Sequence, residues 1–281
     1  MTDFLRPATV EDALALMAAG GVVPLAGGTD LYPATQRRAL PGLVLDVTGL
    51  PGLCGITTGP AGLRIGAATT WTALARATLP PALAALQQAA VEVGGIQIQN
   101  AGTIGGNLCN ASPAADGVPP LLVLDTEVEL VGHRGIRRLP LSQFLTGPRQ
   151  TARQADELLT ALHIPASALS GQSHFRKLGA RAYLVISIAM VAVRLDLQAG
   201  RISHAALAVG ACSATACRLP QVESALTGAP AAEAPALIRD ADVAAALSPL
   251  DDLRATAAYR SGAAAELLRR SVATLCQPVP A

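Results

Sequence analysis

The sequence predicts an α+β protein in which three regions follow one another along the chain. The first region alternates strand, helix and strand, the second mixes short strands with helices, and the third places a strand hairpin before helices. A small and polar tract broken by proline and glycine, residues 165–173, separates the last two regions. We therefore expect an N-terminal lobe at 1–54, a larger lobe at 55–168 and a C-terminal module at 172–281.

A βαβ unit is expected at the N-terminus. Thr9 can cap a helix whose third residue is Asp12, and Leu14 and Met17 then supply its apolar face. A pair of glycines ends this helix. Strands "VVPLA" and "LVLDV" follow, and the loop "GGTDLYPA" comes directly after the first of them.

The middle region combines strands and helices. The stretch "LRIGAAT" predicts a strand and "WTALARA" a helix, and a second helix begins at Pro80 and Pro81, because proline suits a first helical turn. A segment rich in glycine and asparagine comes next. After it, "LLVLD", "EVELVG" and "IRRLPL" predict strands, and "DELLTALHIP" closes the region.

The C-terminal region predicts a hairpin followed by helices. Strands "IAMVAVRLDL" and "RISHAALAVGAC" are joined by "QAG", which suits a short turn with its glycine in a left-handed conformation. The stretches "VESALTG" and "ATAAYRSGAAAELLRRSVATL" are helical in pattern. The longest apolar run, "YLVISIAMVAV", is too short to span a bilayer, so we assign it to the core.

Composition and charge argue against several classes of protein. A net charge of +1 without any long run of like charge leaves no basic surface for nucleic acid or an anionic membrane. The charged first residues do not form an export signal, so we expect a cytoplasmic protein without a membrane span. The 5 cysteines include no C-x-x-C pair and the 4 histidines are scattered, so no metal site is predicted.

Two glycine-rich segments are the strongest motifs, "LAGGTDL" at 25–31 and "NAGTIGGNLCN" at 100–110. Each offers backbone N–H groups without bulky side chains, and such groups bind phosphate oxygens. Neither segment is the P-loop motif or the dinucleotide fingerprint that opens a helix after a first strand. A diphosphate cradled between two separate loops remains, with an ordinary tight turn as the alternative for either loop alone.

The order and surroundings of these loops carry a more specific signal. The succession "PLAGGTDL", "GGIQIQNAGTIGGNLCNASPAAD" and "FRKLGARAYLVISIAMVAV" resembles the FAD-binding medium subunit of the xanthine dehydrogenase and carbon monoxide dehydrogenase family of molybdenum hydroxylases. The similarity covers nearly the whole chain. It implies a two-lobed FAD-binding fold of the vanillyl-alcohol-oxidase (PCMH) type with a C-terminal sheet-and-helix module.

The resemblance also implies which residues bind FAD. The first loop is expected to wrap the diphosphate, and the second to reach both diphosphate and flavin. Asp116 is expected at the ribityl and diphosphate region, and Lys177 near the isoalloxazine ring. The complete set is Ala26, Gly27, Gly28, Thr29, Asp30, Asn100, Thr103, Ile104, Gly105, Gly106, Asn107, Asp116 and Lys177. No residue is assigned a catalytic role.

Lys177 is the only lysine among the 21 basic residues of the chain. A cation near the flavin would stabilise negative charge on the reduced cofactor and so raise its reduction potential. This role would give the single lysine a function. Without the resemblance, a solvated surface lysine is the alternative.

Partners are implied by the resemblance alone. They are a large subunit with a molybdenum cofactor, where substrate is hydroxylated, and a small subunit whose two [2Fe-2S] clusters pass electrons to FAD. A heterohexamer of paired subunits and an external acceptor complete the expected system. The alternatives are an independent FAD-dependent reductase or oxidase of the same wider fold and a flavin-free assembly subunit, which the intact loops disfavour.

Overall fold

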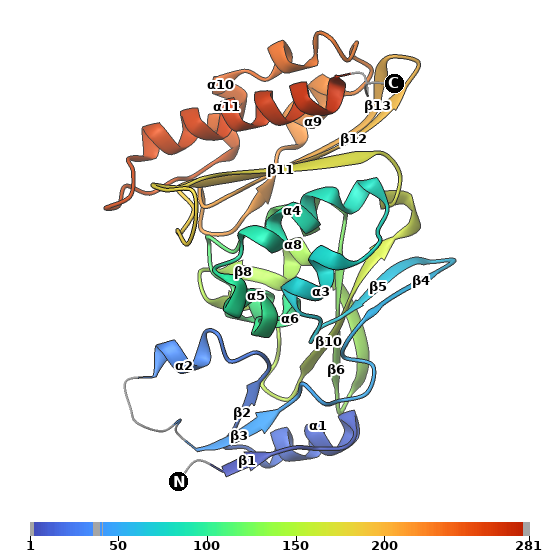
Figure 1. Cartoon of the computed structure of the whole chain (residues 1–281), viewed down its shortest axis with the longest axis vertical. Coiled ribbons are helices and arrows are strands. Elements are labelled where there is room, and N and C mark those ends of the chain that lie inside the picture. Colours follow the sequence, from blue (N-terminus) through green and yellow to red (C-terminus); the bar gives the residue numbers. More distant parts are fainter. Residues whose placement is uncertain (1–2, 36–39, 41, 278–281) are drawn as a thin grey trace.

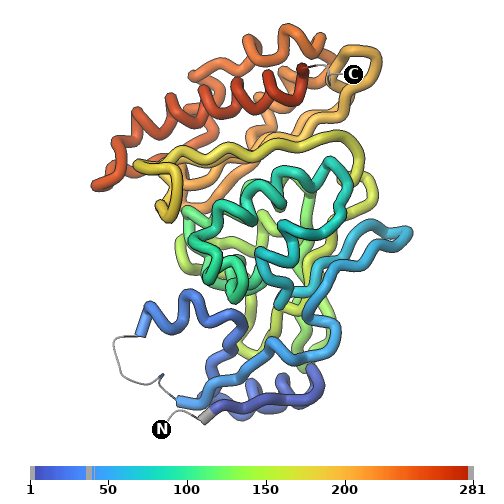
Figure 2. Tube along the Cα trace, viewed as in Figure 1, coloured from blue at the N-terminus to red at the C-terminus, as the bar shows by residue number. Residues whose placement is uncertain are grey.

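A computed structural model describes residues 3–35, 40 and 42–277 of the chain. Three main sheets follow one another along the long axis of the molecule, and helices cover the C-terminal sheet at one end (Figure 1). The trace passes from the N-terminal region at the opposite end through the middle region to this C-terminal one (Figure 2). The mixed helix and sheet content confirms the predicted α+β class.

The N-terminal sheet is three-stranded and parallel, with order β1-β3-β2. The elements are β1 (Asp3–Leu5), α1 (Val10–Ala19), β2 (Val22–Leu25), α2 (Leu31–Ala34) and β3 (Leu43–Asp46). As predicted, the Thr9 hydroxyl accepts a hydrogen bond of 3.1 Å from the Asp12 N–H at the start of α1. Leu14 and Met17 of this helix are buried in the predicted manner, and they share a hydrophobic cluster with Leu45.

The middle region is built on a five-stranded antiparallel sheet of order β4-β5-β10-β6-β7. Its strands are β4 (Ile56–Gly59), β5 (Gly62–Gly66), β6 (Glu127–Gly132), β7 (Gly135–Pro140) and β10 (Leu158–Pro165), and β8 (Leu145–Gly147) pairs separately with β9 (Gln150–Thr151). Its helices are α3 (Trp71–Arg76), η1 (Pro81–Leu83), α4 (Ala84–Glu92), α5 (Ile96–Ala101), α6 (Ile104–Asn110), α7 (Val118–Val123), α8 (Leu141–Phe144) and η2 (Ala166–Ala168). The largest hydrophobic cluster joins the sheet and these helices to one face of the C-terminal sheet.

One predicted strand of the middle region is wrong. The stretch "LLVLD" lies largely in helix α7, and the chain turns at Asp125, which has a φ of 49°, before β6. Pro119 and Pro120 occupy the first turn of α7, where a backbone N–H is not needed. Every residue of α7 is buried, so no alternation of apolar and polar positions marks it as a helix.

The C-terminal region is a four-stranded sheet of order β11-β12-β13-β14 with helices on one face (Figure 1). Its elements are β11 (Gln172–Leu178), β12 (Ala189–Gln198), β13 (Arg201–Gly210), β14 (Cys217–Arg218), α9 (Pro220–Leu226), η3 (Ala234–Leu237), α10 (Asp240–Ala246) and α11 (Ala257–Cys276). The predicted turn between β12 and β13 is confirmed, with positive φ at Ala199 and Gly200. On β12, Val191 belongs to the cluster under the helices and Ala192 to the core of the middle region. Burial on both faces explains the continuous apolar sequence of this strand.

The predicted burial of the run "YLVISIAMVAV" is only partly correct. β12 begins at Ala189, whereas Tyr183, Leu184 and Ile186 lie in the preceding loop with exposed fractions of 79%, 58% and 61%. Burial alone therefore does not account for the first half of the run.

Within the described residues, no helix has both the length and the apolar composition that a membrane crossing requires.

Candidate cofactor-binding site

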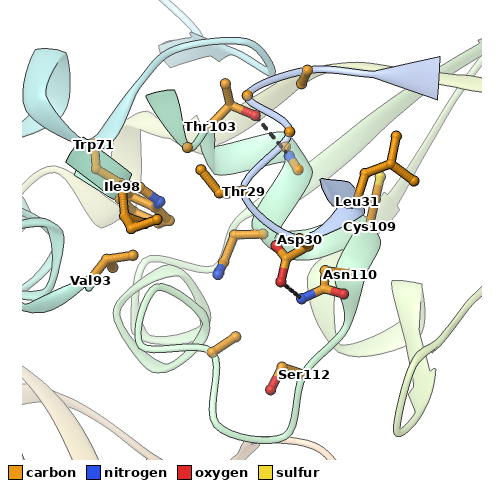
Figure 3. A pocket seen from close by; sticks show the side chains of 18 of the residues that line it. Thr29, Asp30, Leu31, Trp71, Val93, Ile98, Thr103, Cys109, Asn110 and Ser112 are labelled. Atoms are coloured by element: carbon orange, nitrogen blue, oxygen red, sulfur yellow. Dashed lines mark hydrogen bonds between the residues drawn. The ribbon is translucent and has the colours of Figure 1, made fainter. Parts of the chain in front are cut away.

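A cavity of about 840 Å³ lies between the three regions of the chain. This volume is in the upper part of the range of about 300–1,000 Å³ that is typical of ligand pockets. Figure 3 shows Trp71, Val93 and Ile98 on one side of the view and Asp30 and Asn110 on the other. From the predicted set, the wall contains Ala26, Gly27, Gly28, Thr29, Asp30, Thr103, Gly105, Gly106, Asn107, Asp116 and Lys177.

The first glycine loop presents unused hydrogen-bond donors to this cavity. The backbone N–H groups of the four residues from Gly27 to Asp30 have no acceptor among the described residues. Gly28 has a φ of 71°, which favours glycine. A Cβ atom on Gly27 would lie 1.8 Å from the Ala101 carbonyl oxygen, so this glycine permits close packing against the end of α5. Such a row of free amides suits the oxygens of an anionic ligand.

The second glycine loop differs from the expectation that its backbone N–H groups are free. It forms the start of α6, where the Thr103 hydroxyl accepts a hydrogen bond of 3.1 Å from the Gly106 N–H. The N–H groups of Ile104 and Gly105 donate to the carbonyls of Thr69 and Ala67 at 3.0 and 2.8 Å. These bonds satisfy the helix terminus, so contacts to a ligand from this loop must come largely from side chains.

Asn107 supplies such a side chain. Its Oδ1 is buried and has no hydrogen-bond partner among the described residues, although the residue lines the cavity. An unpaired buried oxygen is costly, and a ligand donor would remove that cost. Together with the free amides of the first loop, this atom fits the mixed phosphate and polar-ring chemistry of FAD.

Two residues of the predicted set do not line the cavity. Ile104 is fully buried in the main hydrophobic cluster. Asn100 lies on α5, and its Oδ1 accepts a hydrogen bond of 2.6 Å from the Thr72 hydroxyl. Both therefore have packing or bonding roles within the protein in this structure, and contact with a cofactor by either remains a prediction.

An acid and a base meet at the other part of the wall. The Lys177 ammonium donates to Asp116 Oδ2 at 2.5 Å and to the Glu92 carbonyl at 3.4 Å. The buried Ser187 hydroxyl donates to Asp116 Oδ1 at 2.7 Å. Burial raises the pKa of the Asp116 carboxyl, and the Lys177 ammonium opposes that shift. Both oxygens of this carboxylate therefore accept hydrogen bonds from the protein. These bonds join the segment before α7 to β11 and to the loop before β12.

Several residues of the site are not among those predicted from the sequence. Trp71 lines the cavity from α3, and Arg149 and Arg153 line it from the β8–β9 segment. Ser187 lies behind the wall and acts through Asp116. The two arginines belong to "LTGPRQTARQADELLTALHIP", a stretch covered by the family resemblance, and this was the available signal. Within the described ranges, no group of three or more His, Cys, Asp or Glu side chains is arranged to hold a metal ion.

The sequence matches two family models in succession. Residues 1–167 match the family described as the FAD binding domain in molybdopterin dehydrogenase. Residues 174–275 match the CO dehydrogenase flavoprotein C-terminal domain.

Named relatives and a solved structure agree with these matches. The chain is 36% identical over 231 residues to a putative xanthine dehydrogenase FAD-binding subunit of Escherichia coli (strain K12), which covers 80% of this chain and 79% of the relative. It is 32% identical over 275 residues to the carbon monoxide dehydrogenase medium chain of Afipia carboxidovorans. This match covers 96% of this chain and 95% of the relative. It superposes on a chain of reconstituted CO dehydrogenase from Oligotropha carboxidovorans with a TM-score of 0.88 and 30% identity, over 98% of both chains.

Proposed function

Since this chain belongs to the FAD-binding medium subunits of the molybdenum hydroxylase family, we propose that it is the electron-transfer subunit of such a complex. It is an oxidoreductase subunit with FAD as its cofactor. In the proposed route, the [2Fe-2S] clusters of a small partner subunit supply electrons and an external acceptor receives them. FAD, when bound, supplies the ability to accept single electrons and to release a pair.

The cavity wall is the observation that carries this proposal. The free amides from Gly27 to Asp30 would bind the diphosphate, and Asn107 would meet a polar group of the cofactor. Lys177 would hold its positive charge beside the isoalloxazine ring, where charge develops on reduction. Asp116 and Ser187 would fix the position of that ammonium group, because each is hydrogen-bonded in the same cluster.

The proposed complex also includes a large subunit with the molybdenum cofactor. Support comes from relatives named as medium chains or medium subunits, such as that of nicotine 6-hydroxylase from Paenarthrobacter nicotinovorans. A heterohexamer and a cytoplasmic location stay predictions. We also propose the division into 1–54, 55–168 and 172–281, and the ends of the two family matches at 167 and 174 support its second boundary.

The visible absorption spectrum of the isolated chain tests the proposal. The protein is mixed with FAD, separated from excess cofactor by gel filtration and then reduced by a partner small subunit that has been reduced beforehand. Retained flavin bands that bleach on mixing are expected. Turnover with NADH and a small substrate, without any partner, would instead indicate an independent reductase. A folded chain that stays colourless even when expressed with both partners would indicate a flavin-free subunit.

A further inference from the structure

Two arginines in the cavity wall have no acidic partner in the part of the chain that the structure describes. Arg149 and Arg153 come from the segment that contains β8 and β9, and neither forms an ion pair with a described carboxylate. Asp30 also forms no ion pair with a described residue, whereas the remaining charged side chains of the wall are paired. Lys177 is paired with Asp116, and the wall residue Glu157 is paired with Arg137, which lies outside the wall.

Arg149 is held in place by its backbone and by Asn110. Its φ of 60° is unusual for a residue with a side chain, and its N–H donates to the Ala111 carbonyl at 2.8 Å. Its Nη1 donates to the carbonyl oxygen of Asn110 at 3.3 Å and also to Oδ1 of the same residue. A strained backbone that is anchored in this manner is typical of a functional site.

A hydrogen-bond relay connects Arg149 to the first glycine loop. Asn110 Nδ2 donates to Asp30 Oδ1 at 2.7 Å, as Figure 3 shows. Asp30 is an acid next to the free amides, and its charge would repel an anion bound there. Arg149 polarises the Asn110 amide, and this amide donates to the Asp30 carboxylate. Part of the negative charge of Asp30 is thereby offset, which reduces its repulsion of a bound anion.

Arg153 lies near the same helix and keeps most of its donors unused. Its Nη1 donates to the carbonyls of Gln154 and Glu157 at 3.0 and 2.8 Å, and no described acceptor meets its other N–H groups. It lines the same cavity as Cys109, the neighbour of Asn110 on α6. Arg149 therefore lies at the end of α6, and Arg153 lines the same cavity. Because Asp116 is paired with Lys177 and Glu157 with Arg137, the two arginines face Asp30 as the one remaining carboxylate among the described wall residues.

We propose that Arg149 and Arg153 form a cationic clamp for the diphosphate of FAD, beside the first glycine loop. This inference rests on the proposed function. Amide donors alone supply only partial charge, whereas a diphosphate is a strong anion, and the fork of a guanidinium group matches phosphate oxygens. The clamp explains why these arginines face a cavity without an ion-pair partner among the described carboxylates.

Binding of two flavins to the purified full chain tests the clamp. Dissociation constants for FAD and for riboflavin, which lacks phosphate, are measured by flavin fluorescence for the wild type, Arg149→Gln, Arg153→Gln and the double variant. Each single variant is expected to bind FAD about tenfold more weakly or worse, because a hydrogen bond to a charged group is lost. Riboflavin affinity stays at the wild-type value, and added salt weakens FAD binding less in the double variant than in the wild type.

Arg76→Gln is the matched control, because Arg76 is exposed on α3 and does not line the cavity. Arg149→Lys should recover only part of the FAD affinity, since the charge returns without the fork. The clamp would be overturned if the double variant bound FAD as tightly as the wild type. It would also be overturned if the double variant lost as much affinity for riboflavin as for FAD. If the isolated wild-type chain binds neither flavin, the same variants are measured in the complex with both partner subunits, and a complex whose medium subunit binds no FAD would contradict the proposed function and the clamp with it.

Discussion

The Lys177 ammonium lies 2.5 Å from the Asp116 carboxylate, and the two side chains are only 7% and 8% exposed. Their positions are 61 residues apart in the sequence, so the pair joins β11 to the segment before α7. Removing one member of such a buried pair leaves the other without compensation. The position of the lysine beside the cavity and the stability of the fold are therefore linked.

Lys177→Met should lower the reduction potential of bound FAD. Loss of the cation removes stabilisation of the reduced, negatively charged flavin. Each loss of about 1.4 kcal/mol of that stabilisation lowers a two-electron potential by about 30 mV. Unfolding should also become easier by about 3–5 kcal/mol, because Asp116 is left unpaired. Spectroelectrochemical titration and urea unfolding measure the two effects. Arg176→Met, which removes the neighbouring cation of β11 outside the cavity wall, should leave the potential unchanged.

Ser187→Ala should destabilise the protein through Asp116. The deleted hydroxyl donates at 2.7 Å to a buried carboxylate, and a hydrogen bond to a charged group contributes about 1.5–3 kcal/mol. A double-mutant cycle with Asp116→Asn measures the coupling between the two side chains, while the potential of bound FAD reports on Lys177. Ser203→Ala, at an exposed position, serves as the control. Simple additivity in the cycle would contradict a positioning role for Ser187.

Local chemistry made much of the fold predictable. The Thr9 cap and the Ala199–Gly200 turn depend on neighbouring residues, so the sequence contains what determines them. The helix α7 and the largely exposed stretch 183–186 were not predicted, because their apolar residues have no period that distinguishes a buried helix, a strand or a cavity wall. Tertiary packing decides among these, and a single sequence does not state it.

The candidate site shows the same division. The first glycine loop combines free amides with a glycine at positive φ, both of which its sequence suggests. In the second loop, the backbone N–H groups at the start of α6 donate to carbonyls of the protein, and Ile104 points into the hydrophobic core. Helical geometry sets both outcomes. Arg149 enters the wall only because the chain reverses between β8 and β9. Such long-range placement has no local signature.

Gly27→Ala should weaken FAD binding and lower stability together. The added methyl would lie 1.8 Å from the Ala101 carbonyl oxygen, so the first loop must move away from α5. Overpacking of this kind costs about 1–3 kcal/mol, and the displaced amides no longer converge on the diphosphate. Flavin fluorescence and thermal unfolding measure the two effects. Gly49→Ala is the control, because a Cβ there meets no atom within 4 Å; equal behaviour of both variants would refute the packing argument.

Glu129→Gln should lower stability at neutral pH and lose that effect in acid. Burial alone would raise the pKa of Glu129, but hydrogen bonds from Arg138, Thr160 and His163 outweigh it and hold the pKa below the ordinary 4.5. A depressed pKa means that the ionised carboxylate stabilises the fold above pH 4.5, and this contribution disappears as the pH falls through the folded-state pKa. We expect a deficit of about 1–3 kcal/mol at neutral pH.

Urea unfolding of the wild type and Glu129→Gln across this pH range measures the deficit, which should shrink steadily once the pH is below 4.5. Glu127→Gln is the matched control on the same strand, since Glu127 is exposed and forms no ion pair with a described residue. A deficit that stays constant with pH would show that Glu129 stabilises the sheet through shape and neutral hydrogen bonds. The carboxylate charge would then have no part in holding β6 against β7 and β10.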